Sequence, residues 1–310
     1  MKILDLRQVA SRRLDPLFEE EAQYWLDELL WDYRLSQQLI RKFIDAKSLG
    51  GYATFEDEQP SGYGFYINEE QKGLIGGLYV SPKHAGTETP AVLVQELAGT
   101  MRATPRIHRI EAQLISFGAS YDAALQAEGF RLHQRNFMLL RLADVPLAAA
   151  PVSAGLRLER WDDRYFEACA RLIQLAYANH VDSEINDQYR TEAGALRFLK
   201  NIIILPGCGR FVPEASFVVR PQTEPYLVGA VLNSNVSAGV AHTTQICVMP
   251  GYQRNKLGLR LLAASVQALK SLHYHALSLS VTATNTRAVQ LYDRFGFKLL
   301  KTFTAAVWQE

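Results

Sequence analysis

Apolar residues between positions 246 and 270 change from an unbroken run to helical spacing, with a polar turn between them. The run ends at Pro250 and Gly251, and a basic turn follows. Beyond the turn, the apolar side chains that share one helix face are Leu257, Leu261, Leu262, Val266 and Leu269. The pattern therefore predicts a strand, a turn and a helix that begins inside the turn. Unpaired N–H groups at such a helix N-terminus attract anions.

The first half of the chain reads as a helix followed by a meander of strands. Interleaved charged and apolar residues predict a helix over 16–49, which a pair of glycines ends. The elements predicted next are strands at 52–55, 62–67 and 73–80, a helix at 91–103, a strand at 107–115, a helix at 121–128 and a strand at 137–142.

The same order of elements returns in the second half. The predicted elements are a strand at 156–158, helices at 163–178 and 192–203, strands at 216–219, 226–234 and 243–248, the turn and helix described above, a strand at 276–282, a helix at 286–294 and a final strand that reaches Trp308. The interval from Pro82 to Pro250 equals the interval from Gly129 to Gly296 to within one residue. We therefore predict two copies of one domain, at 1–143 and 156–310, joined by an Ala- and Pro-rich linker at 144–155.

Composition narrows the function classes. The formal net charge of +1 argues against a protein that coats nucleic acid or anionic lipid. No stretch reaches the roughly 18 apolar residues that a membrane span needs, and the N-terminus lacks a signal-peptide pattern. Cys169, Cys208 and Cys247 are widely spaced, which favours reduced thiols over a metal site or a disulfide framework. We expect a soluble cytoplasmic protein without a metal, a membrane or a nucleic-acid partner; the oligomeric state is open.

Two motifs in the second half resemble the GNAT superfamily of acyl-CoA-dependent N-acyltransferases. The signature loop of that family, Q/R-x-x-G-x-G/A, lies between its fourth strand and third helix, and here it reads QRNKLG over 253–258. A second family block, Asn-x-x-Ala-x-x-Leu-Tyr-x-x-x-Gly-Phe, is complete over 285–297. The loop alone is weak evidence, but both motifs occur in the family's order and spacing. The resemblance covers residues 156–310 and implies an α/β (α+β) fold, with a mixed, mostly antiparallel twisted sheet flanked by helices in each copy.

The resemblance also implies how acetyl-CoA would bind. Backbone N–H groups of the loop would hold the pyrophosphate, and the pantetheine arm would lie between two splayed strands. The residues implied in cofactor binding are Ile246, Val248, Gln253, Arg254, Asn255, Lys256, Leu257, Gly258, Leu259 and Asn285. Tyr292 would lie near the thioester sulfur and protonate the departing thiolate, although an aromatic residue at this spacing also suits a core position.

Lys256 departs from the family motif because it replaces the first glycine. If the position requires a positive φ, a residue with a side chain costs roughly 1–2 kcal/mol there. A contact between the ammonium and a phosphate oxygen, worth roughly 1.5–3 kcal/mol, could offset this cost. The alternative is a solvated lysine above a weakened site.

An amine acceptor with a pKa near 10.4 needs help to lose its proton at neutral pH. Members of the family often place a glutamate on the fourth strand for this purpose, but the corresponding strand here holds no carboxylate. His242 is its only titratable residue, and Thr244 and Gln245 could order a water. The second candidates lie in the polar loop after the first helix of this half, and they are His180, Asp182 and Glu184.

The first half keeps the order of elements but lacks the motifs. It lacks the glycine spacing after Pro82 and has Glu88 where a phosphate would need donors. The interval that separates Gly129 from Gly296 also places Gly118 opposite Asn285 and Leu125 opposite Tyr292. We therefore expect a degenerate copy that is retained for packing, for shaping the acceptor cleft or for another ligand.

Three hypotheses follow for function. The leading one is a tandem N-acetyltransferase, active in its C-terminal half, that moves the acetyl group of acetyl-CoA directly to the primary amine of a small molecule or peptide. The alternative is a non-catalytic acyl-CoA-binding sensor or scaffold, which Lys256 and the missing carboxylate favour. A third is an enzyme that modifies protein N-termini or lysines.

Overall fold

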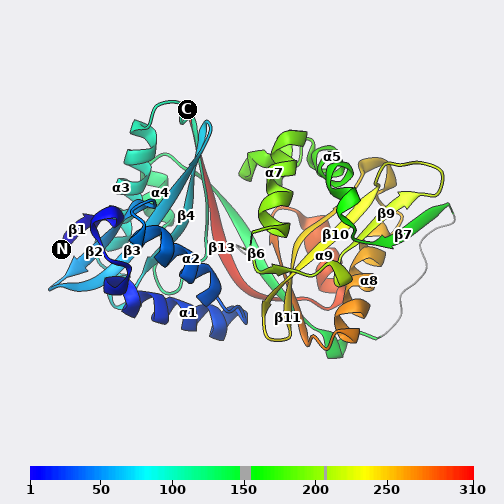
Figure 1. Ribbon diagram of the computed structural model, residues 1–310, viewed down its shortest axis with the longest axis horizontal. Coiled ribbons are helices and arrows are strands. Elements are labelled where there is room, and N and C mark those ends of the chain that lie inside the picture. The colour runs from blue at the N-terminus through cyan, green and yellow to red at the C-terminus, as the bar shows by residue number, and fades with distance from the viewer. Residues whose placement is uncertain (147–154, 206–207) are drawn as a thin grey trace. The chain divides into compact units, whose positions relative to one another are not determined.

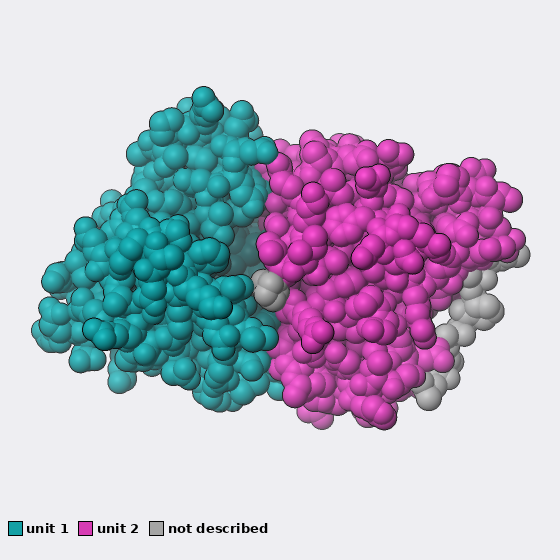
Figure 2. Space-filling model, in the orientation of Figure 1, with its two compact units in different colours: residues 1–135, 302–310 teal, residues 136–301 magenta. Residues whose placement is uncertain are grey.

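The computed structural model describes residues 1–146, 155–205 and 208–310 (Figure 1). The chain forms two compact units, which are coloured separately in Figure 2. The first comprises residues 1–135 and 302–310, and the second comprises residues 136–301. Most of the predicted linker, at 147–154, lies outside the described residues. No helix in these described ranges is long and apolar enough to cross a membrane.

The first unit is a sheet with helices packed against it. Its strands are β1 (Lys2–Asp5), β2 (Gly50–Glu56), β3 (Gln59–Glu69), β4 (Lys72–Val80), β5 (Arg109–Leu114) and the end of β13 (Lys298–Gln309). Its helices are α1 (Asp15–Leu29), α2 (Arg34–Asp45), α3 (Thr89–Ala103) and α4 (Asp122–Ala127). The strands lie in the order β1-β2-β3-β4-β5-β13, and only β4 and β5 are parallel. The apolar faces of α3 and α4 pack on β4 and β5.

The second unit repeats this plan. Its strands are the end of β6 (Arg131–Arg141), β7 (Leu156–Arg160), β8 (Arg210–Phe211), β9 (Phe217–Pro221), β10 (Gly229–Ser237), β11 (Val240–Val248) and β12 (Ala276–Thr282). Its helices are α5 (Phe166–Tyr177), α6 (Val181–Ile185), α7 (Glu192–Ile203), α8 (Leu257–Ser271) and α9 (Thr286–Phe295). The strand order is β6-β12-β11-β10-β9-β7, with β8 beside β10, and β11 and β12 are parallel.

Helices cover both faces of the second sheet. On one face, α5 and α7 bury Leu232 of β10 and Cys247 of β11. On the other, α8 buries Val231 of β10 together with Val219 of β9. Alternate residues of these strands therefore serve two separate cores, as the period of a strand requires.

The predicted repeat of the fold is confirmed. Strand β11 follows β4, and helix α8 follows α3, at one common interval that holds for both ends of each element. Strand β12 ends at the same interval after β5 but begins one position earlier than that interval predicts. In each unit the parallel pair follows the antiparallel meander. The match of element bounds and strand directions shows two tandem copies of one mixed, mostly antiparallel α/β fold.

The compact units differ from the continuous segments predicted from the sequence. In the first unit, residues Thr304 to Gln309 of β13 pair with Leu114 to Arg109 of β5. In the second, Met138 and Leu140 of β6 lie in the core beside Leu277 of β12. Each unit therefore includes a strand end from the other half of the chain. The boundary between the two units consequently does not fall in the predicted linker.

The helix predicted over 16–49 is wrong as a single element, because the structure has two helices there. Leu30 adopts a left-handed conformation with a φ of 56° and ends α1. Trp31 is buried after this turn, and α2 begins at Arg34. The polar and apolar pattern continues through the break because both helices bury one face, which hides the turn in the sequence.

Candidate functional site

The parallel strands of the second unit open into a wedge. Strands β11 and β12 pair only from Val240 opposite Ala276 to Thr243 opposite Leu279. Both strands then continue, β11 to Val248 and β12 to Thr282, without further pairing to each other. Backbone groups on the inner edges of the wedge are therefore available to a bound chain that lies between the strands.

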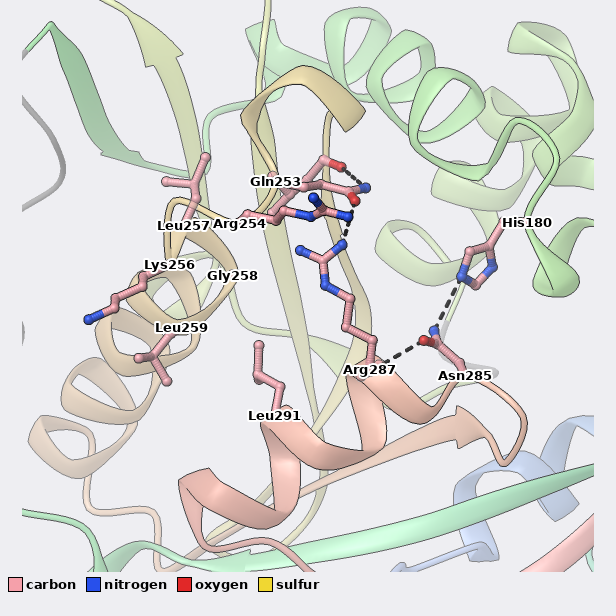
Figure 3. A pocket seen from close by; sticks show the side chains of 12 residues that line it. His180, Gln253, Arg254, Lys256, Leu257, Gly258, Leu259, Asn285, Arg287 and Leu291 are labelled. Atoms are coloured by element: carbon pink, nitrogen blue, oxygen red, sulfur yellow. Dashed lines mark hydrogen bonds between the residues drawn. The ribbon is translucent and has the colours of Figure 1, made fainter.

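A cavity of about 490 Å³ lies where the wedge meets the starts of α8 and α9 (Figure 3). Its lining residues are His180, Val248, Gln253, Arg254, Lys256, Leu257, Gly258, Leu259, Asn285, Arg287, Ala288 and Leu291. The first turns of both helices thus contribute to one cavity. Their unpaired N–H groups and the positive ends of their dipoles favour an anion there.

The backbone of the signature loop is strongly bent. Arg254 and Lys256 have φ values of 67° and 57°, in the left-handed region that favours glycine. Lys256 is the N-cap of α8, and none of the side chains that the structure describes caps this helix end. A Cβ at Gly258 would lie 3.8 Å from Val248 Cγ2, so the helix start packs closely on the end of β11. The loop therefore leaves the N–H groups of the first α8 turn for a ligand.

The cavity is positively charged. Arg254, Lys256 and Arg287 line it, and none of the described residues that line it is acidic. Arg287 Nη1 donates to Gln253 Oε1 over 2.9 Å, and Gln253 Nε2 donates to the carbonyl oxygen of Val248 over 3.2 Å (Figure 3). These bonds connect α9, the loop and β11 across the cavity.

A second cavity of about 760 Å³ continues between α8 and α9. It shares Lys256, Leu259, Arg287 and Leu291 with the first cavity. Arg260 and Arg294 add two more guanidinium groups to its lining. The two cavities together suit a ligand with an apolar ring and several phosphate groups.

A network of hydrogen bonds connects the loop before α6 to the start of α9. Asn285 Oδ1 accepts from the N–H of Ala288 and caps α9, while Asn285 Nδ2 lies 3.2 Å from His180 Nε2. His180 Nδ1 accepts from the N–H of Asp182 over 3.1 Å, and Thr282 Oγ1 donates to the Asp182 carboxylate. His180 also lines a third cavity of about 520 Å³, together with Tyr177, Glu184 and other residues of this loop.

The two residues predicted to act in catalysis lie outside the lining of these cavities. Tyr292 is buried edge-on to Phe297, and its burial and the charge of Asp182 both raise its pKa. His242 is buried in the paired part of β11, stacked on Phe137, with Nδ1 2.8 Å from Ser278 Oγ. Both positions flank the wedge rather than the loop.

The structure brings together most of the residues predicted to bind the cofactor. Of that set, Ile246 and Asn255 do not line the 490 Å³ cavity. The carbonyl oxygen of Ile246 faces Tyr177, whose hydroxyl lies 3.4 Å away. Arg287 lines the cavity without having been predicted, because only the fold brings the start of α9 to the loop.

The equivalent places in the first unit are filled. Tyr121 is the counterpart of Ala288 in the repeat; it is buried and donates its hydroxyl to the carbonyl oxygen of Leu78 on β4 over 3.2 Å. Thr89 and Pro90 at the start of α3 are buried, and the N–H of Thr89 donates to Thr87 Oγ1. Where the second unit has a small alanine beside its cavity, the first has a tyrosine ring, in line with the prediction of a degenerate copy.

Comparisons with known proteins agree with this geometry. Residues 180–297 match the family model described as "Acetyltransferase (GNAT) family". Residues 180–297 of the second unit are a GNAT domain. A comparison with curated protein sequences found no match.

Solved structures of GNAT proteins share the fold along most of the chain. A GCN5-related N-acetyltransferase from Sphaerobacter thermophilus aligns with a TM-score of 0.66 and 17% identity, covering 88% of this chain and 85% of that one. A tandem GNAT protein from the clavulanic acid biosynthesis pathway has a TM-score of 0.59, 13% identity and coverages of 84% and 82%. A GNAT-family acetyltransferase from Colwellia psychrerythraea has a TM-score of 0.54, 11% identity and full coverage of both chains. These identities show the shared fold alone.

The left-handed conformation of Lys256 gives a testable prediction. We expect the ligand-free Lys256→Gly variant to be more stable to urea than Lys256→Ala by about 1 kcal/mol, because both lack the ammonium but only glycine relieves the strain. Acetyl-CoA affinity, measured by calorimetry, should fall equally in the two variants if the ammonium contacts a phosphate. Equal stabilities would contradict a strained backbone at this position.

Proposed function

We propose that the chain is an N-acetyltransferase that moves the acetyl group of acetyl-CoA to a primary amine, with its active site in the GNAT domain. The GNAT fold supports acyl-CoA-dependent acetyl transfer as a general activity. The observation that carries the proposal is the cavity at the converging starts of α8 and α9, which opens onto the β11–β12 wedge.

The chemistry of acetyl-CoA fits the donors of this site. Its pyrophosphate suits the N–H groups of the first α8 turn and the cations Arg254 and Arg287. Its adenosine 3′-phosphate suits the apolar and basic groove between α8 and α9. Its pantetheine amides suit the inner edges of the wedge, where Ile246 and Val248 present carbonyl groups that side chains contact in this structure. Binding would replace those side-chain contacts.

The residues that flank the wedge supply the proton transfers. Ser278 Oγ donates to the carbonyl oxygen of Ala241, which favours the His242 tautomer that carries its proton on Nδ1 and donates it to Ser278 Oγ. A neutral imidazole in this tautomer is suited to accept the proton that the amine loses during attack. The raised pKa of Tyr292 keeps its hydroxyl protonated at neutral pH, as a donor to the departing thiolate must be.

The two buried cysteines favour direct attack over an acyl-enzyme. Burial raises the pKa of Cys247 to about 12 and raises that of Cys169 as well, so both remain thiols at neutral pH. A thiol is a weak nucleophile compared with a thiolate. The amine nitrogen therefore bonds to the acyl carbon itself, and the C–S bond breaks as the tetrahedral intermediate collapses.

A sensor or scaffold that binds acyl-CoA without turnover is the second candidate. The strained lysine in the loop and a β11 strand without a carboxylate favour it. The enzyme hypothesis includes three classes of acceptor, which are the amines of small molecules, of peptides and of proteins.

Acetyl-CoA binding provides the first test. We expect saturating acetyl-CoA to raise the Tm of the full chain, and we expect Gly258→Glu to abolish this shift, because the carboxylate would enter the positive cradle. Gly258→Ala is the matched control, since its methyl group would make only ordinary contact with Val248. A wild-type Tm that does not change would overturn the proposal.

Turnover separates the enzyme from the sensor. A panel of small amines, amino acids, amino sugars and peptides would be screened for the release of free CoA thiol by the wild-type chain. Release with any amine above the rate of acetyl-CoA hydrolysis supports the enzyme. Binding without release on the whole panel supports the sensor.

A further inference from the structure

Two buried polar atoms on one face of the second sheet have no hydrogen-bond partner among the described residues. They are Gln245 Nε2 on β11 and Ser234 Oγ on β10. The two residues are 4% and 0% exposed. Buried donors in folded proteins are almost always paired. Two unpaired polar atoms on neighbouring strands therefore indicate a place where a ligand supplies the missing partners.

The two residues share the face that α5 and α7 cover. Gln245 lies opposite Leu232, which belongs to the core under these helices, and directly opposite residues share a face. Ser234 follows Leu232 by two residues and therefore faces the same way. The register shift at Thr244 puts His242, opposite Ser234, on this face as well.

This polar face lies at the closed end of the wedge. Pairing of β11 with β12 ends at Thr243, so Gln245 is the second residue inside the wedge. The cradle for the pyrophosphate is at the other, open end, beyond Val248. An extended arm that enters from the cradle and follows β11 inward therefore brings its terminal group toward Gln245.

A tyrosine fixes the orientation of the Gln245 amide. The Tyr177 hydroxyl donates to Gln245 Oε1 over 3.0 Å and also lies 3.4 Å from the carbonyl oxygen of Ile246. Tyr177 itself is held by stacking on Tyr189, with 4.5 Å between ring centroids. With Oε1 bound in this way, Nε2 is the end of the amide that remains to donate.

Taking the acetyltransferase function proposed above as its basis, we propose that Gln245 Nε2 donates a hydrogen bond to the acyl carbonyl oxygen of the thioester. When the amine nitrogen bonds to the acyl carbon, the C=O π pair moves to this oxygen, and the amide N–H stabilises the resulting charge. When the C=O bond forms again, the C–S bond breaks and the sulfur takes its pair and a proton. A preorganised donor at the oxyanion acts mainly on the transition state.

The test uses the wild-type chain and Gln245→Met, which keeps the length of the side chain and removes the donor. The first readout is the ¹³C NMR signal of bound acetyl-CoA labelled at the thioester carbonyl, which needs no acceptor. We expect a downfield shift in the wild type and a signal near the free value in Gln245→Met. With any amine that the wild type acetylates, kcat should fall roughly 10²- to 10³-fold while the Kd of CoA stays within about twofold.

Stability distinguishes this role from a structural one. Gln245→Met removes the unpaired N–H donor, but it also removes the oxygen that accepts from the Tyr177 hydroxyl. That hydroxyl keeps the Ile246 carbonyl oxygen within 3.4 Å, so the Tm of the ligand-free chain should stay close to that of the wild type. Gln245→Glu is the second variant, since it keeps an oxygen for Tyr177 and also lacks the donor; it should lose the carbonyl shift too. Ser234→Ala is the control on the same face and should keep the shift.

An unchanged carbonyl shift and an unchanged kcat in both Gln245 variants would overturn the proposal. The hydrogen-bond partner of Gln245 Nε2 would then be a buried water. A wild-type chain that does not bind acetyl-CoA would instead overturn the proposed function. The two failures are therefore distinct, because the first requires a loaded wild-type protein.

Discussion

Deletion of residues 302–310 is expected to unfold the first compact unit. These residues form the part of β13 that pairs with β5, and they bury Phe303, Ala305 and Val307. Loss of the two large apolar side chains alone removes about 3–6 kcal/mol of burial, before the lost strand pairing is counted. Because a domain is typically stable by only about 5–15 kcal/mol, the remainder of the unit should not stay folded.

Hydrogen exchange followed by mass spectrometry would measure this effect for each unit separately. Peptides from β2 to β5 should lose protection in the truncated chain. Removal of Glu310 alone is the matched control. It takes away one terminal backbone hydrogen bond to the His108 carbonyl oxygen and an exposed side-chain contact with His108, and it should leave protection of the sheet unchanged. Retained protection of β5 after the full deletion would contradict the assignment of residues 302–310 to the first unit.

This exchange of strand ends explains in physical terms why the degenerate copy is retained. The second unit includes Met138 and Leu140 of β6, which pack beside Leu277 and Phe297. A chain that began at residue 156 would lack these residues and would leave the β12 edge of its core uncovered. The first half of the chain therefore supplies part of the core of the second unit, whatever else it binds.

Local motifs made the loop and the second block predictable from the sequence. The QRNKLG loop, the helix after it and the block that begins at Asn285 all depend on neighbours in the sequence, and the structure places them around one cavity. Strand β12 and helix α7 have the predicted bounds, because Gly, Pro or polar residues mark their ends.

Other features depend on contacts between distant residues. Tyr177 meets Gln245 from 68 positions away, and Arg287 meets Gln253 from 34. The sequence could not predict the sign of φ at Lys256, because a lysine can adopt a positive φ at a small cost in free energy. Exchange of β6 and β13 could not be predicted either, since each strand has the same alternating pattern whichever sheet it joins.

Glu21→Gln is expected to stabilise the first unit at pH 8 by about 3 kcal/mol. The Glu21 carboxyl is buried in α1, where it accepts from the Tyr63 hydroxyl over 2.5 Å and from Gln37 Nε2 over 3.2 Å. Burial raises its pKa from 4.5 to about 7, and the hydrogen bonds oppose this rise only in part. Ionisation at pH 8 therefore costs free energy in the folded state that it does not cost in the unfolded chain.

The sign of the pH dependence follows from the raised pKa. In the wild type, the neutral carboxyl contributes its full stability below pH 4.5, and this contribution is lost as the pH rises to 7. Urea unfolding of Glu21→Gln between pH 5 and 8 should lack this loss, since an amide stays neutral and still accepts from Tyr63. Glu20→Gln is the control, because its carboxylate accepts from Tyr79 in a similar way but is only partly buried. The difference in unfolding free energy between the wild type and Glu21→Gln is the quantity to compare. If this difference were the same at pH 8 as at pH 5, the Glu21 carboxylate would be solvated rather than buried.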